Sequence, residues 1–333
     1  MAVIRDMMPS FELFQPATVE DALALLDEHG REAWVMAGGQ DSLDWFKDRA
    51  KRPSAVVDLG AIAPLRGVRA TGDGLEIGAL TTLTEVASHP DILAKYGVLA
   101  RAARRVASPQ IRNQGTLGGN VAQDARCEYY RNGWSCYRAG GNVCYADAPT
   151  GMNREHAIFG GDRCVTVNPS DTAPALVALE AAMVVRNSDG ERVVDAERFF
   201  IGPGVDITRM TVLKPGDLLT AIRVPATWAG ARFYFEKVSD RQSWDFALAN
   251  VAAAIVEESG RIARIRIAVG GVAPYPVRLT AVEDAVRGKA RDEETAAMAG
   301  EIATRGARPL AQNGFKVSLV RALVARAIRG AEA

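Results

Sequence analysis

The stretch from 121 to 168 constrains the fold most, because it interrupts a regular sequence and has no helical or strand period of its own. It holds six glycines, four tyrosines and one tryptophan. Irregular segments of this length inside a compact domain are usually functional or disordered, and the aromatic content argues against disorder. We therefore expect an ordered insert that a ligand or neighbouring contacts hold in place.

All four cysteines of the chain lie in this insert, at Cys127, Cys136, Cys144 and Cys164. Four thiols permit three disulfide pairings, but a chain of 333 residues without an export signal does not need disulfides to fold. The gathering of every thiol in one segment favours a metal or iron–sulfur site instead.

Three states of these thiols remain open from the residues alone: ligands of an iron–sulfur cluster, ligands of zinc, and unligated buried thiols. Four thiolates suit a tetrahedral zinc ion, but structural zinc sites usually pair cysteines about two to four residues apart. Here eight, seven and nineteen residues separate successive cysteines. We expect His156 to be packed or hydrogen-bonded, and not to be a metal ligand.

The rest of the chain alternates between helical and strand patterns. Cap residues and apolar spacing predict helices over 18–30, 82–89, 97–107 and 171–182, and near 279–287, 292–305 and 314–329. Short apolar runs predict strands at 34–37, 55–59 and 75–79, a hairpin turning at 187–190, a strand ending at 225, and long alternating strands from about 230. Strands followed by helices indicate an α+β domain at the C-terminal end.

Charge and hydropathy exclude two classes of protein. The 40 basic residues are balanced by 40 acidic ones, whereas a nucleic-acid-binding domain normally has a basic surplus. No apolar run approaches the roughly 18–20 residues of a membrane-spanning helix. The first twenty residues include Asp6 and Glu12 and lack the apolar region of a signal peptide. The length is typical of two or three domains.

Two glycine-rich runs are candidate ligand-binding loops, Ala37–Leu43 and Ile111–Asn120. Glycine lets backbone amides approach a phosphate closely and adopts positive φ without strain. The second run combines three glycines with short polar side chains, which suits a diphosphate and a flat ring. It is neither a G-x-G-x-x-G turn nor a P-loop, and the alternative for both runs is an ordinary turn.

Together with Gly78–Thr82 and Pro169–Asp171, these runs resemble, in the same order, the FAD-bearing medium subunit of the xanthine dehydrogenase/aldehyde oxidoreductase family of molybdenum hydroxylases. The resemblance continues through Phe235–Lys237 and Asp245–Ala247 and covers essentially the whole chain. The sequence departs from the family at Gln40, which stands in place of the usual threonine. A phosphate contact at that position would therefore come from the backbone or the amide.

The resemblance implies an α+β fold. A para-cresol-methylhydroxylase-type FAD-binding domain of two α/β subdomains would occupy 1–227, with the cysteine-bearing insert at 121–168. A C-terminal α+β flavoprotein domain of antiparallel strands and three helices would occupy 228–333.

The resemblance also implies a set of FAD contacts. The two loops clasping the diphosphate would be formed by Val35, Met36, Ala37, Gly38, Gly39, Gln40, Asp41 and Ser42, and by Thr116, Gly118, Gly119 and Asn120. Asp171 would accept hydrogen bonds from the adenosine half, and Lys237 would approach the pyrimidine edge of the isoalloxazine. Leu219 and Val106 would pack on the flavin. The resemblance assigns no catalytic residue.

For the insert, the resemblance implies a [4Fe-4S] cluster ligated by Cys127, Cys136, Cys144 and Cys164. Two branches of the family carry such a cluster at this place, the bacterial periplasmic aldehyde oxidoreductases and the 4-hydroxybenzoyl-CoA reductases. Four thiolates are what one cubane requires, and their ligation would order an insert that lacks secondary structure.

The function implied is that of an electron-transfer oxidoreductase subunit in a heterotrimer with a [2Fe-2S] small subunit and a molybdopterin-binding large subunit. FAD would pass electrons to an external acceptor, and no residue of this chain would touch the organic substrate. Alternatives are reversed electron flow as in 4-hydroxybenzoyl-CoA reductase, a stand-alone flavin oxidase, and a zinc-stapled binding module. The compartment would be the cytoplasm, or the periplasm through a partner carrying a twin-arginine signal.

Overall fold

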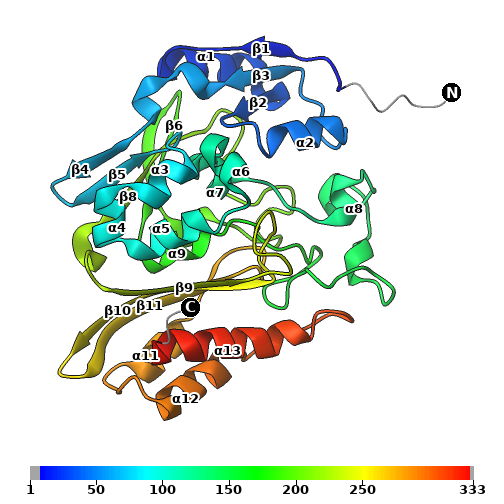
Figure 1. Cartoon of the computed structure of the whole chain (residues 1–333). Coiled ribbons are helices and arrows are strands. Elements are labelled where there is room, and N and C mark those ends of the chain that lie inside the picture. The colour runs from blue at the N-terminus through cyan, green and yellow to red at the C-terminus, as the bar shows by residue number, and fades with distance from the viewer. Residues whose placement is uncertain (1–7, 331–333) are drawn as a thin grey trace.

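The computed structural model describes residues 8–330, so Asp6 and the other residues before Met8, which enter the export-signal argument, lie outside it. Three sheets follow one another from the top to the bottom of Figure 1, each with helices beside it. The cysteine-bearing insert, which contains α8 (Glu128–Arg131), projects to one side of the middle and lower sheets (Figure 1).

The first sheet is small and parallel, in the order β1-β3-β2. Its region contains β1 Glu12–Phe14, α1 Val19–His29, β2 Ala33–Met36, α2 Ser42–Lys47 and β3 Ala55–Asp58. The prediction of α1 is confirmed: the Thr18 hydroxyl accepts a hydrogen bond from the Asp21 amide, and Gly30 (φ +52°) ends the helix. The edge strand β1 was not predicted from the sequence because only three residues form it.

The middle sheet is antiparallel, in the order β4-β5-β8-β6-β7. Its strands are β4 Val68–Thr71, β5 Gly74–Gly78, β6 Ala182–Asn187, β7 Gly190–Asp195 and β8 Leu218–Pro225. The helices of this region are α3 Leu83–Ser88, α4 Pro90–Lys95, α5 Gly97–Arg104, α6 Pro109–Gln114, α7 Leu117–Ala122, α9 Ala173–Ala178 and α10 Ala196–Phe199. The predicted capping box is present, because the side chains of Thr82 and Glu85 each accept from the other's backbone amide.

The second glycine-rich run is helical, and the expectation of a loop there is wrong. It forms the C-terminal part of α6 and most of α7, separated by Gly115. Ser108 caps α6 and is followed by Pro109, which is favourable at the first helical position, while Thr116 caps α7 through the amide of Gly119. These caps outweigh the low helix propensity of the glycines.

The insert has little regular structure, as predicted, and protein contacts hold it in place. Beyond α8 it contains two short 3-10 turns, Tyr137–Ala139 and Tyr145–Asp147. The Asn313 amide donates to the carbonyls of His156 and Ala157, and the Lys316 ammonium donates to the carbonyls of Glu155 and His156. The C-terminal region therefore anchors the end of the insert.

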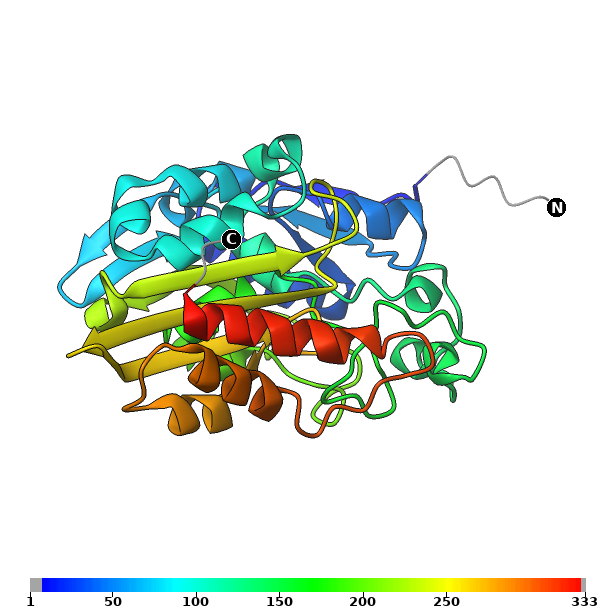
Figure 2. The same ribbon diagram turned by 60° about the horizontal axis from the view of Figure 1, so that its bottom comes forward.

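The third sheet is antiparallel, in the order β12-β11-β10-β9, with β9 Arg232–Val238, β10 Ala249–Glu258, β11 Arg261–Gly270 and β12 Val277–Arg278. Helices α11 Thr280–Val286, α12 Glu293–Ala303 and α13 Phe315–Arg329 cover one face (Figure 2). In β10, Ala253 and Ile255 face these helices, while Ala252 and Ala254 pack against α5 and α9. Burial on both faces explains why this strand is apolar almost throughout.

No helix among residues 8–330 is long and apolar enough to cross a membrane.

Candidate dinucleotide-binding site

A cavity of about 710 Å³ lies where the first sheet meets the middle region. Its walls come from the end of β2 and the loop after it, the start of α7, the segment before α9, the 208–219 segment and the 241–246 loop. Every residue expected to contact FAD lines this cavity except Met36 and Lys237. The two glycine-rich runs, about 75 residues apart in the chain, thus face one space.

Glycine is required at two points of this wall because the backbones approach too closely for a side chain. A Cβ added at Gly38 would lie 2.0 Å from the Gln114 carbonyl oxygen, and one at Gly118 would lie 2.8 Å from that of Ala79. Gly39 has φ +72°, a conformation that residues with a Cβ rarely adopt. Gly38 lets the first run lie directly against Gln114 of the second, and Gly118 lets the second run lie against Ala79.

Asn120 connects the second run to the segment that precedes α9. Its side-chain oxygen accepts hydrogen bonds from the hydroxyls of Ser170 (2.7 Å) and Thr172 (2.6 Å), and all three residues are buried. The Ser170 hydroxyl in turn accepts from the Ala173 amide at the start of α9. This network fixes the backbone on both sides of Asp171.

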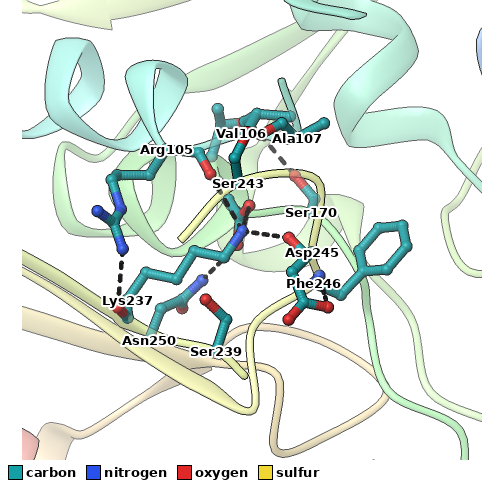
Figure 3. A network of polar contacts seen from close by, with 12 residues as sticks. Arg105, Val106, Ala107, Ser170, Lys237, Ser239, Ser243, Asp245, Phe246 and Asn250 are labelled. Atoms are coloured by element: carbon teal, nitrogen blue, oxygen red, sulfur yellow. Dashed lines mark hydrogen bonds and ion pairs between the residues drawn. The ribbon is translucent and has the colours of Figure 1, made fainter. Parts of the chain in front are cut away.

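Lys237 and Asp171 form a buried ion pair beside the cavity, with 2.6 Å between Nζ and Oδ2. The Lys237 ammonium also donates to the carbonyls of Arg105 (3.1 Å) and Asp245 (2.7 Å), so each of its three protons has an acceptor (Figure 3). Asn250 donates to the other oxygen of Asp171. Burial raises the pKa of Asp171, and Lys237 opposes this rise.

This pairing bears on the expected roles of the two residues. Asp171 was expected at the adenosine half of FAD and Lys237 at the pyrimidine edge of the flavin. Because their charged groups touch, the two residues form one joined polar group beside the cavity and not two separate contacts. Asp171 and Asp245 line the cavity, whereas Lys237 lies behind them.

Sequence reasoning missed two walls of the cavity, the 208–219 segment apart from Leu219 and the 241–246 loop. The missed lining residues with a basic side chain are Arg31, Lys51, Arg126, Arg209, Lys214 and Arg241. The only local signal is a glycine, proline or aspartate beside Arg31, Lys214 and Arg241, and the other three have none. The six basic residues supply positive charge near a site expected to hold a diphosphate.

The four cysteines of the insert form no disulfides. Thiolate charge on Cys127 would interact with Cys164 and Cys144, and charge on Cys164 with Cys144 and Cys136. Burial raises the pKa of Cys127 to about 11 and also raises that of Cys164, while backbone amides donate to both sulfurs. Among residues 8–330, no three His, Cys, Asp or Glu side chains gather closely enough to hold a metal ion.

Aromatic rings pack against the cysteines. Tyr129, Trp134 and Tyr145 contact one another with ring centroids 4.8–5.8 Å apart. Cys127 and Cys144 pack against the hydrophobic cluster that contains Tyr129 and Tyr145. The thiols therefore have an apolar shield of the kind that limits water access to a redox centre.

His156 is hydrogen-bonded, as predicted: its Nε2 lies 3.3 Å from Cys127 Sγ. Burial, with a smaller effect of Lys316, lowers the pKa of His156 to about 4, so the ring is neutral at physiological pH. His156 and Cys127 line a second cavity of about 330 Å³. This cavity shares Arg126, Pro169, Asp171 and Phe246 with the larger one.

Two parts of the sequence match known domain families. Residues 9–227 match the FAD binding domain in molybdopterin dehydrogenase, and residues 234–331 match the CO dehydrogenase flavoprotein C-terminal domain. Among curated proteins, the chain is 30% identical to the carbon monoxide dehydrogenase medium chain of Hydrogenophaga pseudoflava over 328 residues, 97% of each chain. It is 33% identical to the aldehyde oxidoreductase FAD-binding subunit PaoB of Escherichia coli (strain K12) over 305 residues, 90% of this chain and 92% of PaoB.

Solved structures of related enzymes have the same fold as this chain. A chain of the carbon monoxide dehydrogenase from Hydrogenophaga pseudoflava superposes with a TM-score of 0.77 at 30% identity, covering 98% of both chains. A chain of quinoline 2-oxidoreductase from Pseudomonas putida 86 superposes with a TM-score of 0.76 at 26% identity, again covering 98% of both. The fold predicted from the sequence is thereby confirmed.

Proposed function

Because the chain belongs to the family of FAD-binding medium subunits of the molybdenum hydroxylases, we propose that it transfers electrons between redox centres of partner subunits and an external acceptor. One observation carries this proposal: two glycine-rich runs far apart in the sequence line a single cavity of about 710 Å³, which suits a dinucleotide. FAD, when bound, supplies the electron-transfer chemistry. No residue of this chain is assigned to the organic substrate.

Some residues of the cavity bind the cofactor, and others adjust how easily it is reduced. The loop from Val35 to Ser42 and the segment from Thr116 to Asn120 hold the diphosphate, since Gly38 and Gly118 keep the backbones close. Val106 and Leu219 offer apolar contact from two further walls. Gln40 contributes its backbone or its amide in place of a threonine hydroxyl.

Lys237 places positive charge at the pyrimidine edge of the flavin, where a cation favours the reduced form. In this structure each proton of its ammonium has an acceptor, so direct contact with the flavin requires one acceptor to be released. The Asp245 carbonyl belongs to the loop between β9 and β10, and it is the acceptor easiest to displace. Asp171 keeps the ammonium in position throughout.

The insert binds a [4Fe-4S] cluster through Cys127, Cys136, Cys144 and Cys164. The chemistry of the donor set fits: all four cysteines are unpaired, and backbone amides donate to the sulfurs of Cys127 and Cys164. No two of the cysteines are separated by about two to four residues, the spacing usual in structural zinc sites, and this favours the cluster over zinc.

The chain works in a heterotrimer with a [2Fe-2S] small subunit and a molybdopterin-binding large subunit. Two features of the related Hydrogenophaga enzyme support this assembly: its similar subunit is called a medium chain, and the solved enzyme is described by reference to a molybdenum cofactor. We place the domain boundary at 227/228, close to where the two family matches end and begin. The complex resides in the cytoplasm, or in the periplasm after export with a twin-arginine partner.

Purification under anaerobic conditions with the partner subunits tests the proposal directly. The complex should be coloured, with one FAD on this chain, and about four irons and four sulfides beyond those of the small subunit. The Cys136→Ser/Cys164→Ser variant should lose that extra iron and sulfide but keep the flavin. If the complex contains flavin but no extra iron, the cluster proposal is wrong and the role of the family stands. If the complex contains no flavin, the electron-transfer role is wrong. If it contains zinc in place of the extra iron, the insert holds a structural zinc site.

A further inference from the structure

His156 presents one ring nitrogen to a cysteine sulfur. Its Nε2 lies 3.3 Å from Cys127 Sγ, and only 7% of the His156 surface is exposed. A thiolate sulfur accepts hydrogen bonds and has no proton to give, so the nitrogen facing it must carry the hydrogen. In the state in which Cys127 ligates metal, His156 is therefore the Nε2–H tautomer.

The other ring nitrogen agrees with this tautomer. Within residues 8–330, His156 Nδ1 is buried and has no hydrogen-bond partner. The residue lines the second cavity, where a water molecule could donate to an unprotonated Nδ1. The geometry therefore makes Nε2 the donor to the sulfur and leaves Nδ1 facing the second cavity.

The backbone of His156 is held on both sides of its Cα. The His156 amide donates to the Asn153 carbonyl, and the His156 carbonyl accepts from Asn313 (3.0 Å) and Lys316 (3.1 Å). These contacts fix the point from which the side chain projects, and burial of the residue limits the movement of the ring.

Cys127 lies on the side of the insert that faces the dinucleotide cavity. It lines the second cavity, which shares four residues with the larger one, whereas Cys136, Cys144 and Cys164 line neither. Arg126, the residue before Cys127, lines both cavities and pairs with Asp41 of the first glycine-rich run (2.7 Å). A hydrogen bond at Cys127 therefore acts one residue away from Arg126, which lines the larger cavity itself.

We propose that His156 is a positioning residue for the cluster: its Nε2–H donates to the Cys127 thiolate, holds that sulfur toward the flavin cavity and raises the reduction potential of the cluster. This inference rests on the proposed function, because it requires the cluster. A hydrogen bond to a ligating sulfur withdraws electron density and favours the reduced, more negative cluster.

Three substitutions separate the hydrogen bond from mere packing. In His156→Gln the amide nitrogen reaches about as far along the side chain as Nε2, so it can still donate to sulfur. In His156→Asn the amide nitrogen corresponds to Nδ1 and falls short. His156→Phe keeps the ring volume and removes both nitrogens. The readouts in the assembled complex are iron and sulfide per chain and an EPR-monitored potentiometric titration.

We expect the His156→Gln cluster to titrate close to the wild-type potential, and those of His156→Asn and His156→Phe to titrate at clearly more negative potentials. Loss of the cluster in the Asn and Phe variants alone would also support the inference. Wild-type potentials in all three loaded variants, or a negative shift in His156→Gln equal to that in His156→Phe, would overturn it and leave the proposed function intact. A wild-type complex without the extra iron would overturn the inference and the proposed cluster, and would leave the electron-transfer role of the flavin.

Discussion

The ammonium of Lys237 and the carboxylate of Asp171 lie 2.6 Å apart, and each side chain is only 3% exposed. Lys237 comes from β9 and Asp171 from the segment before α9, so the pair joins the third sheet to the middle region. Desolvating two charges is costly, and the pair is stable because Asn250 and two carbonyls satisfy the remaining donors and acceptors.

Removing one partner of this pair should destabilise the fold more than removing both. Lys237→Met leaves a buried carboxylate without its cation and should lower the free energy of unfolding by about 3–5 kcal/mol. The Lys237→Met/Asp171→Asn double variant should recover much of that loss. Chemical denaturation followed by tryptophan fluorescence measures both. A double variant as unstable as the sum of the single variants would contradict a direct interaction.

Gly38 should tolerate no side chain. In Gly38→Ala the new Cβ would lie 2.0 Å from the Gln114 carbonyl oxygen, which must push the two glycine-rich runs apart. FAD affinity should fall by about tenfold or more, equivalent to about 1.4 kcal/mol.

Gly72→Ala is the matched control, because a Cβ there would meet no atom within 4 Å. Flavin titration by fluorescence quenching compares the two variants. Equal affinity of Gly38→Ala and wild type would show that the two runs do not grip the dinucleotide together.

Lys316 should make stability depend on pH above neutrality. Burial lowers its pKa to about 7, whereas an unfolded lysine titrates near about 10.4. Between these values the unfolded chain binds one proton more than the folded chain, so stability should rise with pH, by up to about 1.4 kcal/mol per unit. Unfolding free energies measured from pH 7 to 9.5 should show this slope in wild type and in the exposed-site control Lys47→Met. Lys316→Met should lack it, and an unchanged slope there would refute the assignment.

Asn313 should protect the insert from proteolysis. Its amide donates to the carbonyls of His156 and Ala157, and its side-chain oxygen accepts from the Leu310 amide. Asn313→Ala removes this partner from the Ala157 carbonyl and the Leu310 amide, at a cost of about 1–3 kcal/mol each where they stay buried, while the His156 carbonyl keeps Lys316. Limited proteolysis should then cut within 126–165 faster than in wild type. Asn313→Asp keeps the acceptor alone and should fall between the two. Identical cleavage rates would mean that other contacts hold the insert.

Local signals were enough to predict much of the fold. Thr18 and Gly30 bounded α1, and the box at Thr82 started α3, because caps act over three or four residues. The helical form of the second glycine-rich run was missed because its glycines outweighed two capping hydroxyls in the sequence pattern.

The site was only partly predictable, for a physical reason. The glycine-rich runs carry their own signature, so the two clasping segments were found. The pairing of Lys237 with Asp171 joins residues 66 apart, and the 208–219 and 241–246 walls have no motif. Such contacts depend on how the three sheets meet, and periodicity along the chain contains no information about that. The support of the insert by Asn313 and Lys316 was hidden for the same reason.

The bonds from Lys316 to the end of the insert span 161 residues of chain. During synthesis the N-terminal regions emerge from the ribosome first, and the cysteines are exposed to the cell long before α13 exists. The segment can take up its final arrangement only when the last helix has been made and has docked. The insert therefore reaches its final form only after translation ends, and its four thiols stay unprotected until then.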